Sequence, residues 1–304
     1  STTNATGDNG TYGNPDNDPF NNLQEFINLT NPLVANMFPL IDHFEDGNIS
    51  VNPKWEAVQN IDGIIDAFDA VMVARGDLGV EVPLEQVPLI QKNVIEKASL
   101  AGKPVIIATQ ILDSMTERPV PTRAEVSDIA NAILDGADAL MVTGETAMGD
   151  FPEKVIDVLT RVIGETESAI NYRDFAISRG QNRLNTAKAI SHAACTVARD
   201  QEIKILITMT HSGSTARMTS RYRPAARIIA MTPKEKTCRQ LSIVWGVTPF
   251  LIREYTSSDE IADVANEILT RENLLSDGEK YVITGGVPVG IPGTTNYLSV
   301  LKLV

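Results

Sequence analysis

From about residue 49 onward, the chain alternates short apolar runs with longer segments of helical periodicity. Each apolar run is short enough for a buried strand, and the segments between the runs have apolar side chains every three or four residues. The expected strands are 49–51, 71–74, 105–109 and 139–143, and the expected helices are 58–67, 88–101, 122–136 and 152–163. Repeated strand–helix units with buried strands predict a parallel sheet covered by helices.

A second set of elements follows a mixed, polar stretch over residues 168–185, which is typical of a linker. A helix is expected over 186–200, and strands are expected at 203–209, 227–231, 247–252 and 280–284. This organisation predicts an atypical, partly disordered segment (1–50), the second half of a barrel (51–167) and a separate α/β domain (182–304).

Composition and charge narrow the class of partner. The chain has 304 residues and a formal net charge of −13, which argues against nucleic acid as a partner because such binding needs a basic face. No apolar stretch is long enough to span a bilayer, and no signal segment is recognised, so we expect no membrane partner and a cytoplasmic protein. The two cysteines, Cys195 and Cys238, indicate a reducing compartment.

Polar residues follow the end of each expected strand in the first set. Because the carboxyl ends of parallel strands meet at one rim of a barrel, where active sites lie, these residues are expected to gather there. An open sheet would place its ligands mainly at one crevice, so four adjacent polar strand ends favour a (β/α) barrel. The residues are Lys54 and Glu56, then Arg75, Gly76 and Asp77, then Thr109 and Gln110, and finally Thr143, Gly144 and Glu145.

These side chains suit a site for a small anion. Asp77 and Glu56 are carboxylates on neighbouring strand ends, and Mg²⁺ is commonly held by one or two carboxylates together with water and substrate oxygens. Lys54 adds a positive charge, Thr109 adds a hydroxyl, and Gly76 lets a ligand approach the backbone. The alternatives from spacing alone are a structural Lys54–Glu56 pair, a plain surface turn at Asp77, an adhesive Arg-Gly-Asp loop, or another metal-dependent barrel enzyme of enolates such as an aldolase-type lyase.

Longer runs of sequence resemble the pyruvate kinase family. The runs are "MVARGDLGVEVPLEQVPLIQK", "AGKPVIIATQILDSM", "PTRAEVSDIANAILDGADALMVTGETAMGDFP" and "VWGV", in the order of that family, and the resemblance extends over about residues 51–304. It implies strands five to eight of a (β/α)₈ TIM barrel followed by a three-layer α/β effector domain. It also implies phosphoryl transfer between phosphoenolpyruvate and ADP, giving pyruvate and ATP, with Mg²⁺ or Mn²⁺ and K⁺ as cofactors, in a homotetramer.

The resemblance also implies roles for individual residues. Lys54 corresponds to the catalytic lysine that stabilises the transferring phosphoryl group and the enolate oxygen. Glu56 and Asp77 correspond to the metal ligands. The main-chain N–H groups of Gly76 and Asp77 would bind the substrate carboxylate together with Thr109, which is implied to be both catalytic and substrate-binding.

Part of the family pattern has no match in this sequence. Residues 1–50 contain no counterpart of the family's Asn-Phe-Ser-His motif, of its phosphoryl-contacting arginine or of its K⁺ ligands, and no lid domain is recognised. We therefore expect little turnover from this chain alone. The alternative hypothesis is a non-catalytic remnant that binds a phosphorylated metabolite or serves in assembly.

A hydroxyl-rich turn in the second domain is a candidate phosphate site. The stretch "THSGSTAR" (210–217) lies between an expected strand and an expected helix, where N–H groups and hydroxyls can bind phosphate. It resembles the family's effector loop, and 286–296 resembles the loop that closes over a phosphorylated effector. The expected phosphate-binding residues are Thr210, Ser212, Ser214 and Thr215.

Overall fold

The computed structural model describes residues 61–170, 185–255, 257, 260–289, 291 and 294–303. The expected strand at 49–51, and with it Lys54 and Glu56, lies outside these residues. The chain has two compact units, Ser1–Phe68 and Asp69–Val304. In the first unit, the described element is helix α3 (Ile61–Ala67), with Ile61 and Ile65 buried. The predicted division into a barrel part and an effector domain near residues 168–185 stays a prediction.

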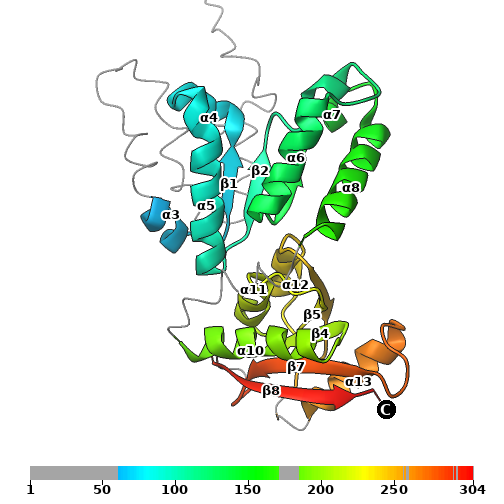
Figure 1. Ribbon diagram of the computed structural model, residues 1–304. Coiled ribbons are helices and arrows are strands. Elements are labelled where there is room, and N and C mark those ends of the chain that lie inside the picture. The colour runs from blue at the N-terminus through cyan, green and yellow to red at the C-terminus, as the bar shows by residue number, and fades with distance from the viewer. Residues whose placement is uncertain are drawn as a thin grey trace, which may run out of the picture. The chain divides into compact units, whose positions relative to one another are not determined.

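The second unit begins with a three-stranded parallel sheet in the order β1-β2-β3 (Figure 1). The strands are β1 (Val71–Ala74), β2 (Val105–Ala108) and β3 (Ala139–Met141). Val73 pairs with Ile107, and Ile107 pairs with Leu140, so the three carboxyl ends lie in register. The predicted parallel arrangement of these three strands is confirmed, although β2 and β3 end one and two residues earlier than expected.

Helices connect the strands of this sheet. They are α4 (Arg75–Glu81), η2 (Leu84–Gln86), α5 (Val87–Ala101), η3 (Asp113–Thr116), α6 (Arg123–Asp135), α7 (Gly144–Ala147) and α8 (Pro152–Ser168). The predicted capping box is present at the start of α6, where the Thr122 side chain accepts from the Glu125 N–H and the Glu125 side chain accepts from the Thr122 N–H. Helix α5 ends at Gly102, whose φ of 73° places it in the left-handed region.

A five-stranded sheet in the order β6-β5-β4-β7-β8 forms the rest of the unit. Its strands are β4 (Ile205–Met209), β5 (Arg227–Thr232), β6 (Val247–Leu251), β7 (Lys280–Gly286) and β8 (Thr295–Lys302). The first four were predicted. Strand β8 was not: its first two residues fall in the expected loop 286–296, and no element was assigned to the remainder; it pairs antiparallel with β7 at the edge of the sheet.

Helices cover both faces of this sheet, as the predicted three-layer arrangement requires (Figure 1). On one face, Ile207, Ile229 and Ile283 pack with the apolar side of α13 (Glu260–Arg271). On the other face, Leu206 and Val282 pack with α10 (Thr186–Asp200). Helices α11 (Ser214–Ser220) and α12 (Glu235–Leu241) share a further buried cluster with β5.

Two arginines after α11 bond to the ends of helices α5 and α6 in the same unit. Arg221 Nη1 donates to Leu100 O at 2.8 Å, and Arg223 Nη2 donates to Gly136 O at 2.6 Å and to Asp138 Oδ1 at 3.2 Å. The Arg223 guanidinium also lies 4.6 Å from the centre of the Trp245 ring. These contacts tie the end of α11 and the loop after it to the segments that enter β2 and β3.

No helix among the described residues is both long enough and apolar enough to cross a membrane.

Candidate functional site

The segment beyond β1 is a helix rather than a turn. Helix α4 begins at Arg75 immediately after the strand, so Gly76 and Asp77 lie in its first turn. The Arg75 side chain is only 7% exposed, which rules out an adhesive Arg-Gly-Asp loop because such a loop must present its arginine to a partner. Asp77 is exposed at this strand end.

The segment beyond β2 has an unusual backbone. Thr109 and Gln110 have φ angles of 62° and 54°, so two successive residues with a Cβ are in the left-handed region. Such a conformation costs on the order of 1 kcal/mol or more for each residue and persists only where surrounding contacts hold it. Because strained backbone is found disproportionately at functional sites, this conformation makes the end of β2 a candidate functional site.

Thr109 and Gly76 meet across the neighbouring strand ends. The Gly76 N–H donates to Thr109 Oγ1 at 2.8 Å. A Cβ on Gly76 would lie 3.4 Å from Thr109 Oγ1, an ordinary van der Waals contact, so this approach does not by itself require glycine. Since the Thr109 hydroxyl already accepts one hydrogen bond, its own proton is available for an acceptor beyond the strand ends.

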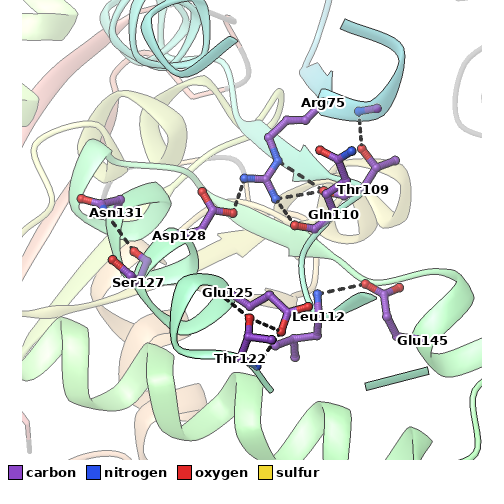
Figure 2. Close-up of polar contacts among 11 residues, drawn as sticks. Arg75, Thr109, Gln110, Leu112, Thr122, Glu125, Ser127, Asp128, Asn131 and Glu145 are labelled. Atoms are coloured by element: carbon purple, nitrogen blue, oxygen red, sulfur yellow. Dashed lines mark hydrogen bonds and ion pairs between the residues drawn. The ribbon is translucent and has the colours of Figure 1, made fainter. Parts of the chain in front are cut away.

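The Arg75 guanidinium bonds to the carbonyl oxygens of the left-handed segment (Figure 2). Nη2 donates to Thr109 O at 2.9 Å and to Gln110 O at 2.7 Å, and Nε donates to Thr109 O at 3.2 Å. Nη1 forms an ion pair with Asp128 of α6. The Nε, Nη1 and Nη2 atoms of Arg75 therefore all contact oxygens of the second strand–helix unit, β2 and α6.

A buried carboxylate joins the ends of β2 and β3. Glu145, at 3% exposure, accepts from Leu112 N at 3.1 Å and from Thr143 N at 2.8 Å. Nearby, burial raises the pKa of Asp113, and the negative charges of Glu145 and Glu125 raise it further. Glu145 thus fixes the loops of the site through backbone bonds, a structural role for a residue that the sequence analysis had placed only at a strand end.

Of the five residues predicted for the catalytic site, the structure describes three. It brings Gly76 and Thr109 into contact and places Asp77 in the same turn as Gly76, while Lys54 and Glu56 lie outside the described residues. Within the described residues, no group of three or more His, Cys, Asp or Glu side chains is arranged to hold a metal ion. The exposed carboxylate of Asp77 could serve as one metal ligand, with water and substrate oxygens filling the remaining coordination positions of the ion.

The predicted phosphate loop lines a hollow in the second sheet domain. Three of its four predicted residues line the hollow, and Ser214 is not among them. Thr210 Oγ1 accepts from Gly213 N at 2.9 Å, and Thr215 Oγ1 lies 2.8 Å from Thr295 Oγ1. The lining residues are Met209, Thr210, His211, Ser212, Thr215, Tyr255, Gly286, Ile291, Thr294 and Thr295.

A cation lies directly against this loop. Arg217 Nη2 donates to Ser212 O at 3.0 Å, so the side chain folds back toward the loop. Burial lowers the pKa of Arg217, an effect that the charge of Asp69 opposes. Gly213 has a φ of 81°, in the left-handed region that favours glycine, and a Cβ there would lie 2.8 Å from Nη1 at the flexible end of Arg217.

The sequence analysis did not predict the structural roles of three residues in these two sites. Arg75 and Glu145 were noted only as polar residues after strands, and Thr295 was placed in a loop. A signal for Glu145 was present, since a carboxylate within a helix start beside a buried strand commonly accepts backbone N–H bonds. The role of Arg75 had no signal, because it depends on the left-handed backbone at Thr109 and Gln110.

The three-stranded parallel sheet brings polar groups together at its strand ends, and helices cover both faces of the five-stranded sheet. The chain is therefore an α/β protein with a partial barrel and a separate α/β layer structure. The model of the pyruvate kinase barrel domain matches residues 45–156, and that of the pyruvate kinase alpha/beta domain matches residues 188–301. The chain belongs to the pyruvate kinase family, with parts of both of these domains.

Individual relatives agree with this assignment. A pyruvate kinase of Clostridium acetobutylicum is 48% identical over 246 residues, which is 81% of this chain and 52% of the relative. One of Sporosarcina psychrophila is 45% identical over 271 residues, which is 88% of this chain and 46% of the relative. The crystal structure of a pyruvate kinase from Cryptosporidium parvum superimposes with a TM-score of 0.75 at 37% identity, covering 82% of this chain and 50% of that one. The chain spans about half the length of these relatives.

Proposed function

We propose that the strand ends of β1 and β2 form part of the active site of a pyruvate kinase-type phosphotransferase. The reaction would transfer a phosphoryl group between phosphoenolpyruvate and ADP, giving pyruvate and ATP. The observation that supports this most directly is the contact of Gly76 N–H with Thr109 Oγ1, one residue from the exposed carboxylate of Asp77.

The described residues would bind and orient the substrate. The Thr109 hydroxyl, held as an acceptor by Gly76, donates its proton to a carboxylate oxygen of phosphoenolpyruvate. In the first turn of α4, the Asp77 N–H group would contact the same carboxylate, whereas the Gly76 N–H, which was expected to do so as well, is already donated to Thr109 Oγ1. Fixing the carboxylate in this way positions the enol phosphate, and positioning is most of what phosphoryl transfer requires of a protein.

Asp77 would hold a divalent ion, Mg²⁺ or Mn²⁺, together with Glu56, which lies outside the described residues. When bound, the ion acts as a Lewis acid on the oxygen that becomes the enolate. Lys54, also outside the described residues, would add a positive charge beside the transferring group. K⁺ dependence, a homotetramer and a cytoplasmic location are proposals that follow from the family alone.

Binding of phosphoenolpyruvate to the Mn²⁺-loaded chain, measured by calorimetry, tests this function. Thr109→Val keeps the branched shape but removes the hydroxyl, and we expect it to weaken phosphoenolpyruvate binding about tenfold while Mn²⁺ binding is retained. Thr160→Val, on an exposed face of α8, is the matched control and should bind like the wild type. Equal affinity of the Thr109 variant and the wild type would remove this threonine from the site. A lactate dehydrogenase-coupled assay of the chain alone is expected to give little turnover.

A second function is favoured by the hollow in the five-stranded domain. The chain would bind a phosphorylated effector there, and this binding would persist in the alternative in which the chain is a non-catalytic remnant. Thr210, Ser212 and Thr215 line the hollow with hydroxyl-bearing side chains, and the Arg217 guanidinium, which does not line it, donates to Ser212 O of the same loop. Ser214, at the first position of α11, would contribute its N–H group rather than line the hollow.

A thermal-shift panel with sugar phosphates, AMP and inorganic phosphate tests this second function on the whole chain. A ligand that binds only the native state raises the melting temperature as its concentration rises. Ser212→Asp places a negative charge in the hollow and should abolish the rise, whereas Ser168→Asp, at the exposed end of α8, should leave it intact. Equal stabilisation of wild type and Ser212→Asp would show that the ligand binds elsewhere.

A further inference from the structure

Two successive residues beyond β2 aim their carbonyl groups at one side chain. The left-handed φ angles of Thr109 and Gln110 form the start of a left-handed turn, in which successive carbonyls point in similar directions. Parallel carbonyl dipoles concentrate negative partial charge at one place. A cation at that place offsets both the repulsion between the two carbonyl oxygens and the conformational cost of the left-handed backbone.

Arg75 is that cation, and its geometry matches the two carbonyls. Its planar fork reaches Thr109 O through two nitrogens, at 2.9 and 3.2 Å, and Gln110 O through one, at 2.7 Å. A lysine has a single nitrogen on a flexible stem and cannot make this set of bonds. The side chain is buried, so water does not replace these donors readily.

The same residue begins the helix that donates to Thr109. Arg75 is the first residue of α4, and the N–H of the next residue, Gly76, bonds Thr109 Oγ1. Arg75 therefore fixes the Thr109 carbonyl through its side chain, while Gly76 fixes the Thr109 hydroxyl through its N–H group. Asp128, at the remaining edge of the guanidinium, restricts its rotation by an ion pair.

We propose that Arg75 is a positioning residue, which holds Thr109 and Gln110 in the left-handed conformation and thereby aims the Thr109 hydroxyl at the substrate. The substrate part of this inference rests on the proposed function. The backbone part does not, because it concerns contacts present without any ligand.

The variants are Arg75→Lys, which keeps the charge but loses the fork, and Arg75→Met, which loses both. The control for Arg75→Met is Lys92→Met, since Lys92 forms an ion pair with Asp135 between α5 and α6, away from the strand ends.

The first measurement is NMR of the 304-residue chain: the Cα and Cβ chemical shifts of residues 109 and 110, and hydrogen exchange of the Gly76 amide. Both Arg75 variants are expected to lose the left-handed shifts and to exchange the Gly76 amide at least tenfold faster, while Lys92→Met matches the wild type.

A compensating change separates positioning from a general loss of stability. Glycine adopts a positive φ at little cost, so Gln110→Gly in the Arg75→Lys background should restore much of the Gly76 amide protection. Gln110→Gly in the wild-type background measures the general gain that glycine brings at a positive φ, and the recovery in the Arg75→Lys background is expected to exceed it. Unchanged shifts and unchanged Gly76 exchange in Arg75→Lys would overturn the proposal, as would the absence of any recovery in the double variant.

The second measurement is phosphoenolpyruvate binding to the Mn²⁺-loaded chain. Arg75→Lys is expected to weaken it about tenfold with Mn²⁺ affinity unchanged, and Gln110→Gly is expected to restore part of the loss. If the wild type itself binds no phosphoenolpyruvate, the proposed function fails, while the NMR measurement still decides whether Arg75 holds the strand end. Wild-type phosphoenolpyruvate affinity in an Arg75→Lys variant with altered shifts would overturn the link from Arg75 to the substrate.

Discussion

At the scale of single residues, the two thiols differ in their surroundings. Both are free, but Cys195 is buried in α10 whereas Cys238 in α12 is partly exposed. Burial raises the pKa of Cys195 to about 12, and burial followed by the charge of Glu235 raises the pKa of Cys238. Since the thiolate is the reactive form, Cys195 is almost wholly unreactive in the native state at neutral pH.

Alkylation with iodoacetamide at pH 8 should therefore modify Cys238 well before Cys195. Cys195 should react only as the surrounding fold opens, so its rate should rise sharply in urea while that of Cys238 changes less. Peptide mapping by mass spectrometry over time measures both rates. Modification of Cys195 at or above the rate of Cys238 in native buffer would contradict the buried position of α10.

Asp113 gives a pH-dependent prediction. Its pKa is raised mainly by burial, so its ionised form is less favourable in the folded chain than in the unfolded chain. The stability lost through Asp113 should grow as the pH rises from its unfolded pKa through its raised folded pKa. Asp113→Asn should thus melt above the wild type near pH 7, and this advantage should shrink toward pH 4. A pH-independent difference between Asp113→Asn and the wild type would be inconsistent with this cause.

Sequence patterns pointed to candidate site residues more readily than to the residues that hold these candidates in place. Gly76, Asp77 and Thr109 were expected at the strand ends from the order of strands and polar residues alone. The strained pair Thr109–Gln110 could not be foreseen, because neither residue is a glycine and β propensity continues the strand through Thr109. Its support by Arg75 comes from a different strand end and needs the three-dimensional fold.

At the scale of elements, the cap of α6 also links this helix to η3. The Glu125 carboxylate accepts from Thr122 N at 2.7 Å, and it also accepts from Ser114 N at 2.8 Å and from Ser114 Oγ at 2.6 Å. The capping box therefore organises the loop that leads away from β2 as well as the helix start.

Removing the cap hydroxyl by Thr122→Ala should lower the free energy of unfolding by about 1 kcal/mol. Ser127→Ala removes an exposed hydroxyl from the middle of the same helix and should be neutral or slightly stabilising, because alanine is the better helix former. Urea denaturation of both variants measures the difference. Similar stabilities of the two variants would mean that the cap contributes little.

The regular elements were predicted well where a run of apolar residues or a cap defined them. The helix after Thr122 was expected from Thr122 and Glu125, and its end from Gly136, and both ends are confirmed. Strand β8 was missed because its residues are mostly half-buried and its identity depends on pairing with β7. Helix α4 was missed because an Arg-Gly-Asp sequence carries little helix propensity.

At the scale of the whole molecule, buried charge joins the loop after α11 to the segment before β3. Asp138 accepts from Val105 N at 2.9 Å, from Trp245 N at 3.2 Å and from Arg223 Nη2 at 3.2 Å. One carboxylate thus contacts the start of β2 and two segments of the five-stranded domain.

Arg223→Ala should lower the free energy of unfolding by about 2–3 kcal/mol, because it leaves a buried carbonyl and carboxylate with fewer donors. Arg253→Ala removes an exposed ion pair with Glu260 and should cost at most about 1 kcal/mol. Trp245 lies against Arg223 and reports the change by fluorescence during urea unfolding. Equal losses in the two variants would contradict a stabilising role for the Arg223 contacts.

The central claim is that the strand ends of β1 and β2 form a metal-dependent site for a small carboxylate substrate, and Mn²⁺ binding at Asp77 tests it most directly. Water-proton relaxation during a Mn²⁺ titration should reveal a site in the wild-type chain whose affinity falls at least about tenfold in Asp77→Ala, since the variant lacks one of the ligand carboxylates. Asp150→Ala, which removes an exposed carboxylate elsewhere, should titrate like the wild type. Unchanged Mn²⁺ affinity in Asp77→Ala would contradict the account.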